Sequence, residues 1–209
     1  MLPRLYPILD LDLCRSRGIE PLALLTAFLA GGARLLQLRD KTSAGAERLA
    51  VADALVRRAH AAGARLVIND RADIARLTGA DGVHVGQDDL AVEDVRRIVG
   101  PDALVGLSTH DEAQIEAAAR TSATYIAVGP IYGTATKDTG YAARGLDLVR
   151  RAAQAGRPVV AIGGITLERA PEVLAAGAAS VAVISGLLTA DPAAMVRSFL
   201  QRLGEAARP

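Results

Sequence analysis

The sequence predicts an α/β fold, a single (β/α)8 TIM barrel over residues 1–209, from two features of its apolar pattern. Short runs rich in Val, Ile and Leu alternate with longer Ala-, Leu- and Arg-rich segments of helical period, which is typical of a parallel sheet covered by helices. Eight such units occur, at about 26 residues each, within the range of a compact barrel. An open doubly wound sheet is the second candidate, but eight regular units without GxGxxG after the first strand disfavour it.

Each expected strand is a short β-rich run that is followed by a segment of helical character. The expected strands cover residues 4–11, 33–40, 64–70, 82–85, 103–109, 124–131, 158–164 and 180–185. The clearest expected helices cover residues 46–63, 92–100, 111–120, 146–156, 167–177 and 192–207. Glycine stands where helices should end, at Gly31, Gly63, Gly100, Gly156 and Gly177.

The composition argues against several classes of function. Lys and Arg number 24 against 23 Asp and Glu, and this near-neutral balance argues against nucleic-acid partners and against a membrane-surface role. Cys14 is the only cysteine, so no disulfide forms within the chain, which fits a reducing compartment. The N-terminus lacks a signal-peptide pattern, and no apolar run approaches the ~20 residues that span a bilayer. We therefore expect a cytoplasmic protein, and the sequence leaves its oligomeric state open, a homo-oligomer included.

The carboxyl ends of the strands are where a barrel of this kind carries its chemistry. The second strand ends in QLRDK, where Gln37, Arg39 and Lys41 share one face of an extended chain. We expect these side chains to point inward at the barrel mouth, because Leu36 and Leu38 would take the face that meets the helices. One amide and two cations suit a polyanionic ligand with a polar ring. The plainer alternative is an Arg–Lys pair in solvent at the start of a loop.

The third and fourth strands end in IND and GQDD, which places Asn69, Asp70, Asp88 and Asp89 at neighbouring strand ends. Carboxylates from adjacent loops beside cations predict a Mg2+ site that bridges to a phosphate. We expect one of Asp88 and Asp89 to cap the next helix or face solvent, and the other to bind the metal. His84, in the middle of the fourth strand, is interpreted as a core histidine whose ring is hydrogen-bonded.

The fifth and sixth strands add hydroxyl groups and a further cation. Ser108 is a hydroxyl at the barrel mouth, and the nearby His110 is interpreted as structural. The sequence GPIYGTATK brings together two hydroxyls and an ammonium group, those of Thr134, Thr136 and Lys137. A Gly- and Thr-rich loop that ends in Lys suits a phosphate or a polar ring, although it is not a P-loop because GxxxxGK[ST] is absent.

The seventh and eighth strands end in glycine and serine. Gly163 and Gly164 allow a ligand to approach the backbone closely, and Ser185 adds a hydroxyl. Barrels often hold a phosphate monoester at this position through backbone N–H groups. With the cationic and acidic strand ends, this predicts two anion sites that face each other across the mouth, an arrangement that suggests group transfer.

Taken in order, the motifs QLRDK, IND, DGVHVGQDD, GLSTH, YIAVGPIYGTATK, VVAIGGI and AVIS resemble those of the thiamine-phosphate synthase family over essentially the whole chain. The resemblance implies a transferase that joins hydroxymethylpyrimidine diphosphate to thiazole phosphate, with Mg2+ as cofactor and with release of pyrophosphate. It implies that the pyrimidine diphosphate is bound by Gln37, Arg39, Lys41, Asn69, Ser108 and Lys137. It implies that the thiazole phosphate is bound by Thr134, Thr136, Gly164, Ile184 and Ser185. It also implies Mg2+ on Asp70 and Asp89, and a catalytic group of Lys137, Arg39 and Ser108.

The implied reaction requires no strong general base, because the thiazole nitrogen is a neutral nucleophile with no proton to remove. The electron-rich aminopyrimidine stabilises a benzylic-type cation, so the family's mechanism looks dissociative, and the enzyme mainly stabilises the departing pyrophosphate. Two alternatives are a thiazole tautomerase-like isomerase with a histidine in the position of His110, and a noncatalytic barrel that senses thiamine precursors. The acidic GQDD pattern and the TxTK loop favour the synthase.

Overall fold

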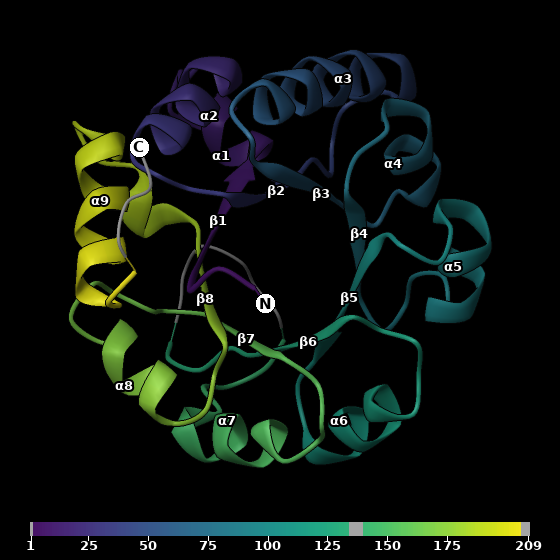
Figure 1. The fold of residues 1–209 in the computed structure, drawn as a ribbon, viewed down its shortest axis with the longest axis vertical. Coiled ribbons are helices and arrows are strands. Elements are labelled where there is room, and N and C mark those ends of the chain that lie inside the picture. The colour runs from purple at the N-terminus through teal and green to yellow at the C-terminus, as the bar shows by residue number, and fades with distance from the viewer. Residues whose placement is uncertain (1, 134–139, 206–209) are drawn as a thin grey trace.

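A computed structural model describes residues 2–133 and 140–205 of the chain, and these residues form a closed barrel of eight parallel strands (Figure 1). The strands follow one another around the barrel in sequence order, and β8 pairs with β1 to close it. The predicted barrel is therefore confirmed and the doubly wound sheet is wrong. The strands are β1 (Leu5–Asp10), β2 (Leu35–Arg39), β3 (Arg65–Asn69), β4 (Gly82–Val85), β5 (Leu104–Thr109), β6 (Tyr125–Val128), β7 (Val159–Ile162) and β8 (Ser180–Val183).

Helices surround the barrel on its outer side (Figure 1). Six lie where the periodicity predicts them: α3 (Gly45–Ala61), α5 (Val92–Val99), α6 (Glu112–Ala119), α7 (Gly145–Ala153), α8 (Ala170–Ala175) and α9 (Pro192–Arg202). The others are α1 (Leu11–Ser16), α2 (Pro21–Ala30), α4 (Ala72–Thr78) and the 3-10 turn η1 (Ser185–Leu187). Among the residues described, no helix has both the length and the apolar character needed to cross a membrane.

Local chemistry explains why α2 begins where it does. Pro21 occupies its first position, where a missing N–H is not needed, and the Glu20 side chain accepts a hydrogen bond from the Ala23 N–H at 2.6 Å. The helix ends at Gly31, the first of the glycines expected at helix ends. A Cβ at Gly31 would lie 2.6 Å from the Cβ of Val196 in α9, so this glycine also allows the two helices to approach closely.

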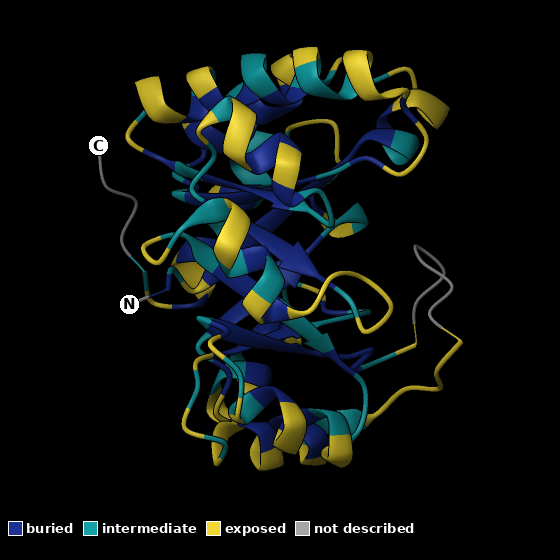
Figure 2. Cartoon of the chain, turned by 90° about the vertical axis from the view of Figure 1, so that its right-hand side faces the viewer, coloured by how far each residue is buried: buried dark blue, intermediate teal, exposed yellow. Residues whose placement is uncertain are grey.

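Two apolar clusters follow from the alternation of side chains along each strand. The larger cluster lies between the strands and the helices and includes Leu36, Leu38 and Val83. The smaller cluster fills the inside of the barrel with side chains that include Tyr6, Tyr125 and the N-terminal Leu2. Figure 2 shows the buried strands at the centre and exposed residues on the outer faces of the helices. The interior is therefore filled at one end, and the open end lies at the carboxyl ends of the strands.

Candidate active site

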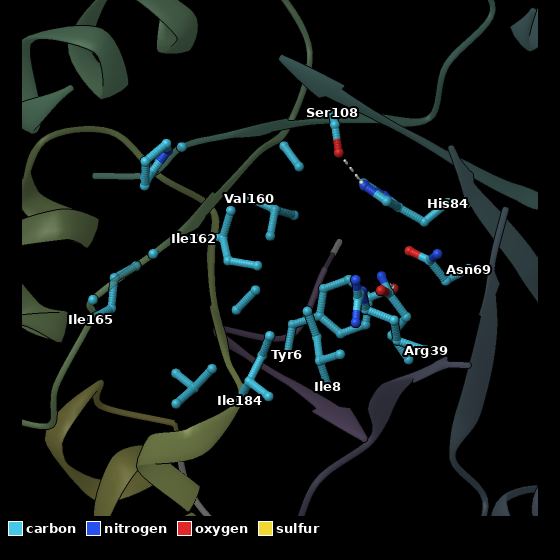
Figure 3. A pocket seen from close by; sticks show the side chains of 18 of the residues that line it. Tyr6, Ile8, Arg39, Asn69, His84, Ser108, Val160, Ile162, Ile165 and Ile184 are labelled. Carbon is cyan, nitrogen blue, oxygen red and sulfur yellow. Dashed lines mark hydrogen bonds between the residues drawn. The ribbon is translucent and has the colours of Figure 1, made fainter. Parts of the chain in front are cut away.

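A cavity of about 130 Å³ opens at the carboxyl ends of the strands, and its lining comes from all eight. The two sides of the cavity differ in chemistry (Figure 3). Arg39, Asn69, His84 and Ser108 lie on one side, which we call the polar side; it is built by the ends of β2 to β5. The other side carries aliphatic side chains and glycine backbone from β7 and β8 and the residues after them, and we call it the glycine side.

On the polar side, Gln37 and Arg39 line the cavity while Leu36 and Leu38 face the helices, as the alternation predicts. The Arg39 guanidinium forms an ion pair with Asp10, its register partner at the end of β1. Asp10 also accepts a hydrogen bond from the Leu13 N–H at 3.0 Å and so caps α1. Arg39 is therefore held at the cavity edge by a carboxylate that is itself anchored.

Lys41 lies beyond the end of β2, is exposed and does not line the cavity. Its ammonium group forms an ion pair with Asp70, which follows β3. The expected cation and the expected metal ligand therefore contact each other directly.

Asp70 and Asp89 converge, although they belong to different loops. Asp70 adopts a left-handed conformation with a φ of 62°, and its N–H donates to the His84 carbonyl oxygen at 2.7 Å. The Asp89 carboxylate accepts a hydrogen bond from the Gly86 N–H at 2.8 Å, which folds it back over the end of β4. Burial raises the pKa of Asp70, and the adjacent Asp89 carboxyl raises it further against the opposing effect of Lys41. Two negative groups thus repel each other at this point.

This pair of carboxylates fits a hard divalent cation. In the described part of the chain no group of three or more His, Cys, Asp and Glu side chains could hold a metal ion, so Asp70 and Asp89 would be the acidic ligands that these residues supply. Mg2+ is commonly held in that way, with substrate oxygens and waters as the remaining ligands. A cation bound between Asp70 and Asp89 would also relieve the repulsion that raises the pKa of Asp70.

Of the two alternatives expected for one aspartate of the pair, capping of the next helix or exposure to solvent, Asp88 shows the second. The N-cap of α5 is Ala91, with no side-chain hydrogen bond to the helix N-terminus. Asp88 is exposed, as is Asp89.

The histidines of the barrel mouth differ from each other in their surroundings. His84 is buried, as expected, but it also lines the cavity, and its Nε2 lies 2.8 Å from the Ser108 hydroxyl (Figure 3). His110 lines the cavity too; its Nδ1 lies 2.6 Å from the Gly129 carbonyl oxygen, and its ring stacks on Tyr141 at 4.3 Å between centroids. Both histidines were expected to be structural, yet both form part of the cavity wall.

The glycine side depends on backbone that only glycine adopts easily. Gly163 and Gly164 have φ values of 101° and 62°. A Cβ at Gly164 would lie 2.5 Å from the Gly133 carbonyl oxygen and 2.8 Å from the Tyr132 Cβ. Ile184 and Ser185 complete this side from the end of β8. The structure thus brings together Gln37, Arg39, Asn69, Ser108, Gly164, Ile184 and Ser185 around one cavity.

Three expected residues lie outside the described residues, namely Thr134, Thr136 and Lys137. Among the polar residues of the site, the sequence did not lead us to expect Asp10, which pairs with Arg39, or Tyr6 and Tyr125, which line the cavity. Asp10 could have been predicted from the sequence, because it ends the first strand with a carboxylate, at the same level as the polar residues that end the other strands. The two tyrosines carry no such signal, since an inward-facing aromatic residue is also what a barrel core requires.

Comparison with known proteins places this site in a family. The sequence model described as thiamine monophosphate synthase matches residues 5–187. A thiamine-phosphate synthase of Koribacter versatilis is 46% identical over 208 residues, which are 97% of this chain and 96% of the relative. Its counterpart from Mycobacterium bovis is 47% identical over 200 residues, 90% of this chain and 88% of the relative.

The fold agrees with these matches. The structure of a thiamine phosphate pyrophosphorylase from Pyrococcus furiosus superposes with a TM-score of 0.87 at 28% identity, covering 96% of this chain and 95% of that one. A 3-hexulose-6-phosphate synthase superposes with a TM-score of 0.69 at 20% identity, over 97% of this chain and 100% of that one, and shows only a shared barrel. The chain therefore belongs to the thiamine monophosphate synthase family and, with it, to the transferases rather than the isomerases.

Proposed function

We propose that the chain condenses 4-amino-2-methyl-5-hydroxymethylpyrimidine diphosphate with 4-methyl-5-(2-phosphoethyl)thiazole, or with its carboxylate form with loss of CO2, to give thiamine phosphate and pyrophosphate. The observation that carries this proposal is the division of one cavity into a charged side and a glycine side. Two anionic substrates with rings between them match that division. The membership of the family supports the same reaction.

The polar side is proposed to bind the pyrimidine diphosphate. Arg39, held by Asp10, faces the diphosphate as a bidentate donor, and Lys41 adds a second positive charge from the loop after β2. Asp70 and Asp89 would hold Mg2+, which when bound would neutralise charge on the departing pyrophosphate. Gln37, Asn69 and Ser108 contact the polar edge of the pyrimidine ring. Lys137, which lies outside the described residues, is proposed to stabilise the same leaving group.

The glycine side is proposed to bind the thiazole phosphate. Gly164 and Ser185 contact the phosphate through backbone N–H groups and a hydroxyl, and Ile184 packs against the thiazole ring. Thr134 and Thr136 belong to this part of the proposal and lie outside the described residues. The phosphate stays on its substrate throughout, so neutral backbone donors are sufficient to hold it.

The reaction itself is a substitution at the methylene carbon of the pyrimidine. The bond to the diphosphate oxygen breaks with its electron pair leaving on pyrophosphate, and the aminopyrimidine carries the resulting positive charge. The thiazole nitrogen then donates its lone pair to the same carbon, and no proton is transferred. The residues of the cavity align the two rings and stabilise the leaving group, which are the forms of catalysis that such a step requires.

A coupled assay tests this proposal. Purified protein with both substrates and Mg2+ should release pyrophosphate and form thiamine phosphate in equal amounts, and removal of Mg2+ with a chelator should stop both. Omission of the thiazole phosphate should abolish formation of thiamine phosphate. Interconversion of thiazole carboxylate isomers without pyrophosphate release would contradict the proposal.

A further inference from the structure

Five side chains form a continuous line of hydrogen bonds across the inside of the barrel. The Gln37 Nε2 donates to the Tyr6 hydroxyl at 3.3 Å, and the Tyr6 and Tyr125 hydroxyls lie 3.1 Å apart. The Tyr125 hydroxyl lies 3.1 Å from His84 Nδ1, and His84 Nε2 lies 2.8 Å from the Ser108 hydroxyl. We call this line the relay. Its two ends, Gln37 and Ser108, both line the cavity.

The relay is tightly built into the fold. Tyr6 and Tyr125 are 1% and 0% exposed, and their rings meet edge to face at 6.0 Å between centroids. The His84 ring stacks on Tyr125 at 5.6 Å. Gly106 makes room for this stack, because a Cβ there would lie 2.2 Å from the Tyr125 ring and 2.4 Å from His84 Nδ1. A side chain on β5 at this position would therefore displace the tyrosine or the histidine.

Both tyrosines keep their protons under ordinary conditions. Burial raises the pKa of Tyr6 to about 12, and burial together with Tyr6 raises the pKa of Tyr125 well above its usual value. Each hydroxyl is therefore one donor as well as an acceptor. In a line of such groups all the hydrogen bonds must run in the same direction. Each hydrogen bond uses one hydrogen, and every buried hydrogen needs an acceptor.

The orientation of Gln37 sets that direction. Because Gln37 donates to the Tyr6 oxygen, the Tyr6 hydrogen is available for Tyr125, and the Tyr125 hydrogen for His84 Nδ1. A neutral His84 then carries its proton on Nε2 and donates it to the Ser108 oxygen. With Gln37 donating, the opposite direction would leave the buried Tyr6 hydrogen without an acceptor in the relay.

We propose that Tyr6, Tyr125 and His84 are positioning residues, which make Ser108 a hydrogen-bond donor and the Gln37 carbonyl an acceptor toward the cavity. The relay links the two ends, so a donor at one end always accompanies an acceptor at the other. An aminopyrimidine matches this pair, because its exocyclic amine donates and its ring nitrogens accept. The identification of the ring rests on the proposed function, whereas the direction of the relay does not.

Nitrogen-15 NMR of the free protein tests the direction without any substrate. The chain has three histidines, and His84→Gln assigns the signals of His84. The expected spectrum shows His84 with a protonated Nε2 and an unprotonated Nδ1. In Tyr125→Phe, both tautomers of His84 should be populated. A wild-type His84 with the proton on Nδ1, or on both nitrogens, would overturn the proposal even if the protein proves active.

Steady-state kinetics test the consequence for the substrate. Tyr125→Phe keeps the ring and removes one hydroxyl, and it should lower kcat/KM for the pyrimidine diphosphate by about ten- to a hundredfold while KM for the thiazole phosphate is unchanged. The matched control is Thr109→Val, which removes a buried hydroxyl on β5 that bonds to the Ala127 carbonyl oxygen outside the relay. This control should lower the melting temperature without changing either kinetic constant.

A double-mutant cycle distinguishes an effect of Tyr125 on Ser108 from a general loss of packing in the core. If the relay acts through Ser108, Tyr125→Phe should cost much less in a Ser108→Ala background than in the wild type. Equal losses in both backgrounds, or equal losses for both substrates, would overturn the proposal. An inactive wild-type protein with the expected His84 spectrum would instead reject the proposed function and leave the relay in place.

Discussion

The polar side and the glycine side of the cavity are proposed to hold anions by different means. The polar side carries Arg39, which is paired with Asp10, and Lys41 lies beyond the end of β2, outside the cavity lining, paired with Asp70. The glycine side uses backbone whose conformation excludes a Cβ. In the proposed reaction, negative charge develops on the leaving group, at the polar side, while the charge of the phosphate on the thiazole stays constant. In that reaction, groups able to respond to a change of charge lie where the bond breaks, and fixed dipoles are sufficient where the charge stays constant.

The largest expected effect concerns the convergent carboxylates. Asp89→Ala should lower turnover by about a hundredfold or more, because it removes one of the two acidic ligands proposed for Mg2+. Asp88→Ala is the matched control, since this neighbouring carboxylate is exposed and does not cap α5. Pyrophosphate release measured over a range of Mg2+ concentrations checks the pair. Equal losses in the two variants would remove the distinction drawn between them.

The next effect tests the glycine side. Gly164→Ala should raise KM for the thiazole phosphate by about thirtyfold, because the new Cβ strains a left-handed residue and meets the Gly133 carbonyl oxygen. Gly63→Ala is the control, since Gly63 has a similar φ of 65° with open space around it. The control should lose stability alone. An equal rise of KM for both substrates in Gly164→Ala would show that the two sides are not separate.

A smaller effect separates charge from geometry on the polar side. Arg39→Lys retains the positive charge but loses the planar fork that engages Asp10 and a phosphate together, and should lower kcat/KM for the pyrimidine diphosphate about tenfold. Arg57→Lys, in an exposed ion pair on α3, is the control and should leave the kinetics unchanged. A variant Arg39→Lys with full activity would mean that a point charge is enough at this position.

The smallest effect is on stability and has the opposite sign to the effect on activity. The pKa of Asp70 is raised in the folded state, so its contribution to stability is complete below its unfolded value and is lost as pH rises through the folded value. Asp89→Asn removes the neighbouring charge and retains an oxygen that accepts from the Gly86 N–H. Without Mg2+, it should raise the melting temperature near pH 7 by about 1–2 °C. A lower melting temperature would contradict the repulsion.

Strand ends were the part of the site that the sequence predicted best, because a period of two fixes which side chains face the barrel interior. Gln37, Arg39 and Ser108 line the cavity for that reason. Residues just beyond a strand were less predictable, since the loop decides their direction. Asp88 and Asp89 are adjacent in sequence and both exposed, yet it is the Asp89 carboxylate that turns back to accept the Gly86 N–H at the end of β4.

The eight-unit barrel, the location of the site at the carboxyl ends of its strands and the residue types found there can be read from the amino-acid sequence, because apolar periodicity and glycine placement act locally. The pairing of groups across strands becomes visible only in the folded chain. The ion pair of Arg39 with Asp10 depends on strand register, and the relay from Gln37 to Ser108 depends on barrel closure, which brings Tyr6 and Tyr125 together over 119 positions of sequence. Such contacts carry no local signal, because each partner alone is an ordinary core or strand-end residue.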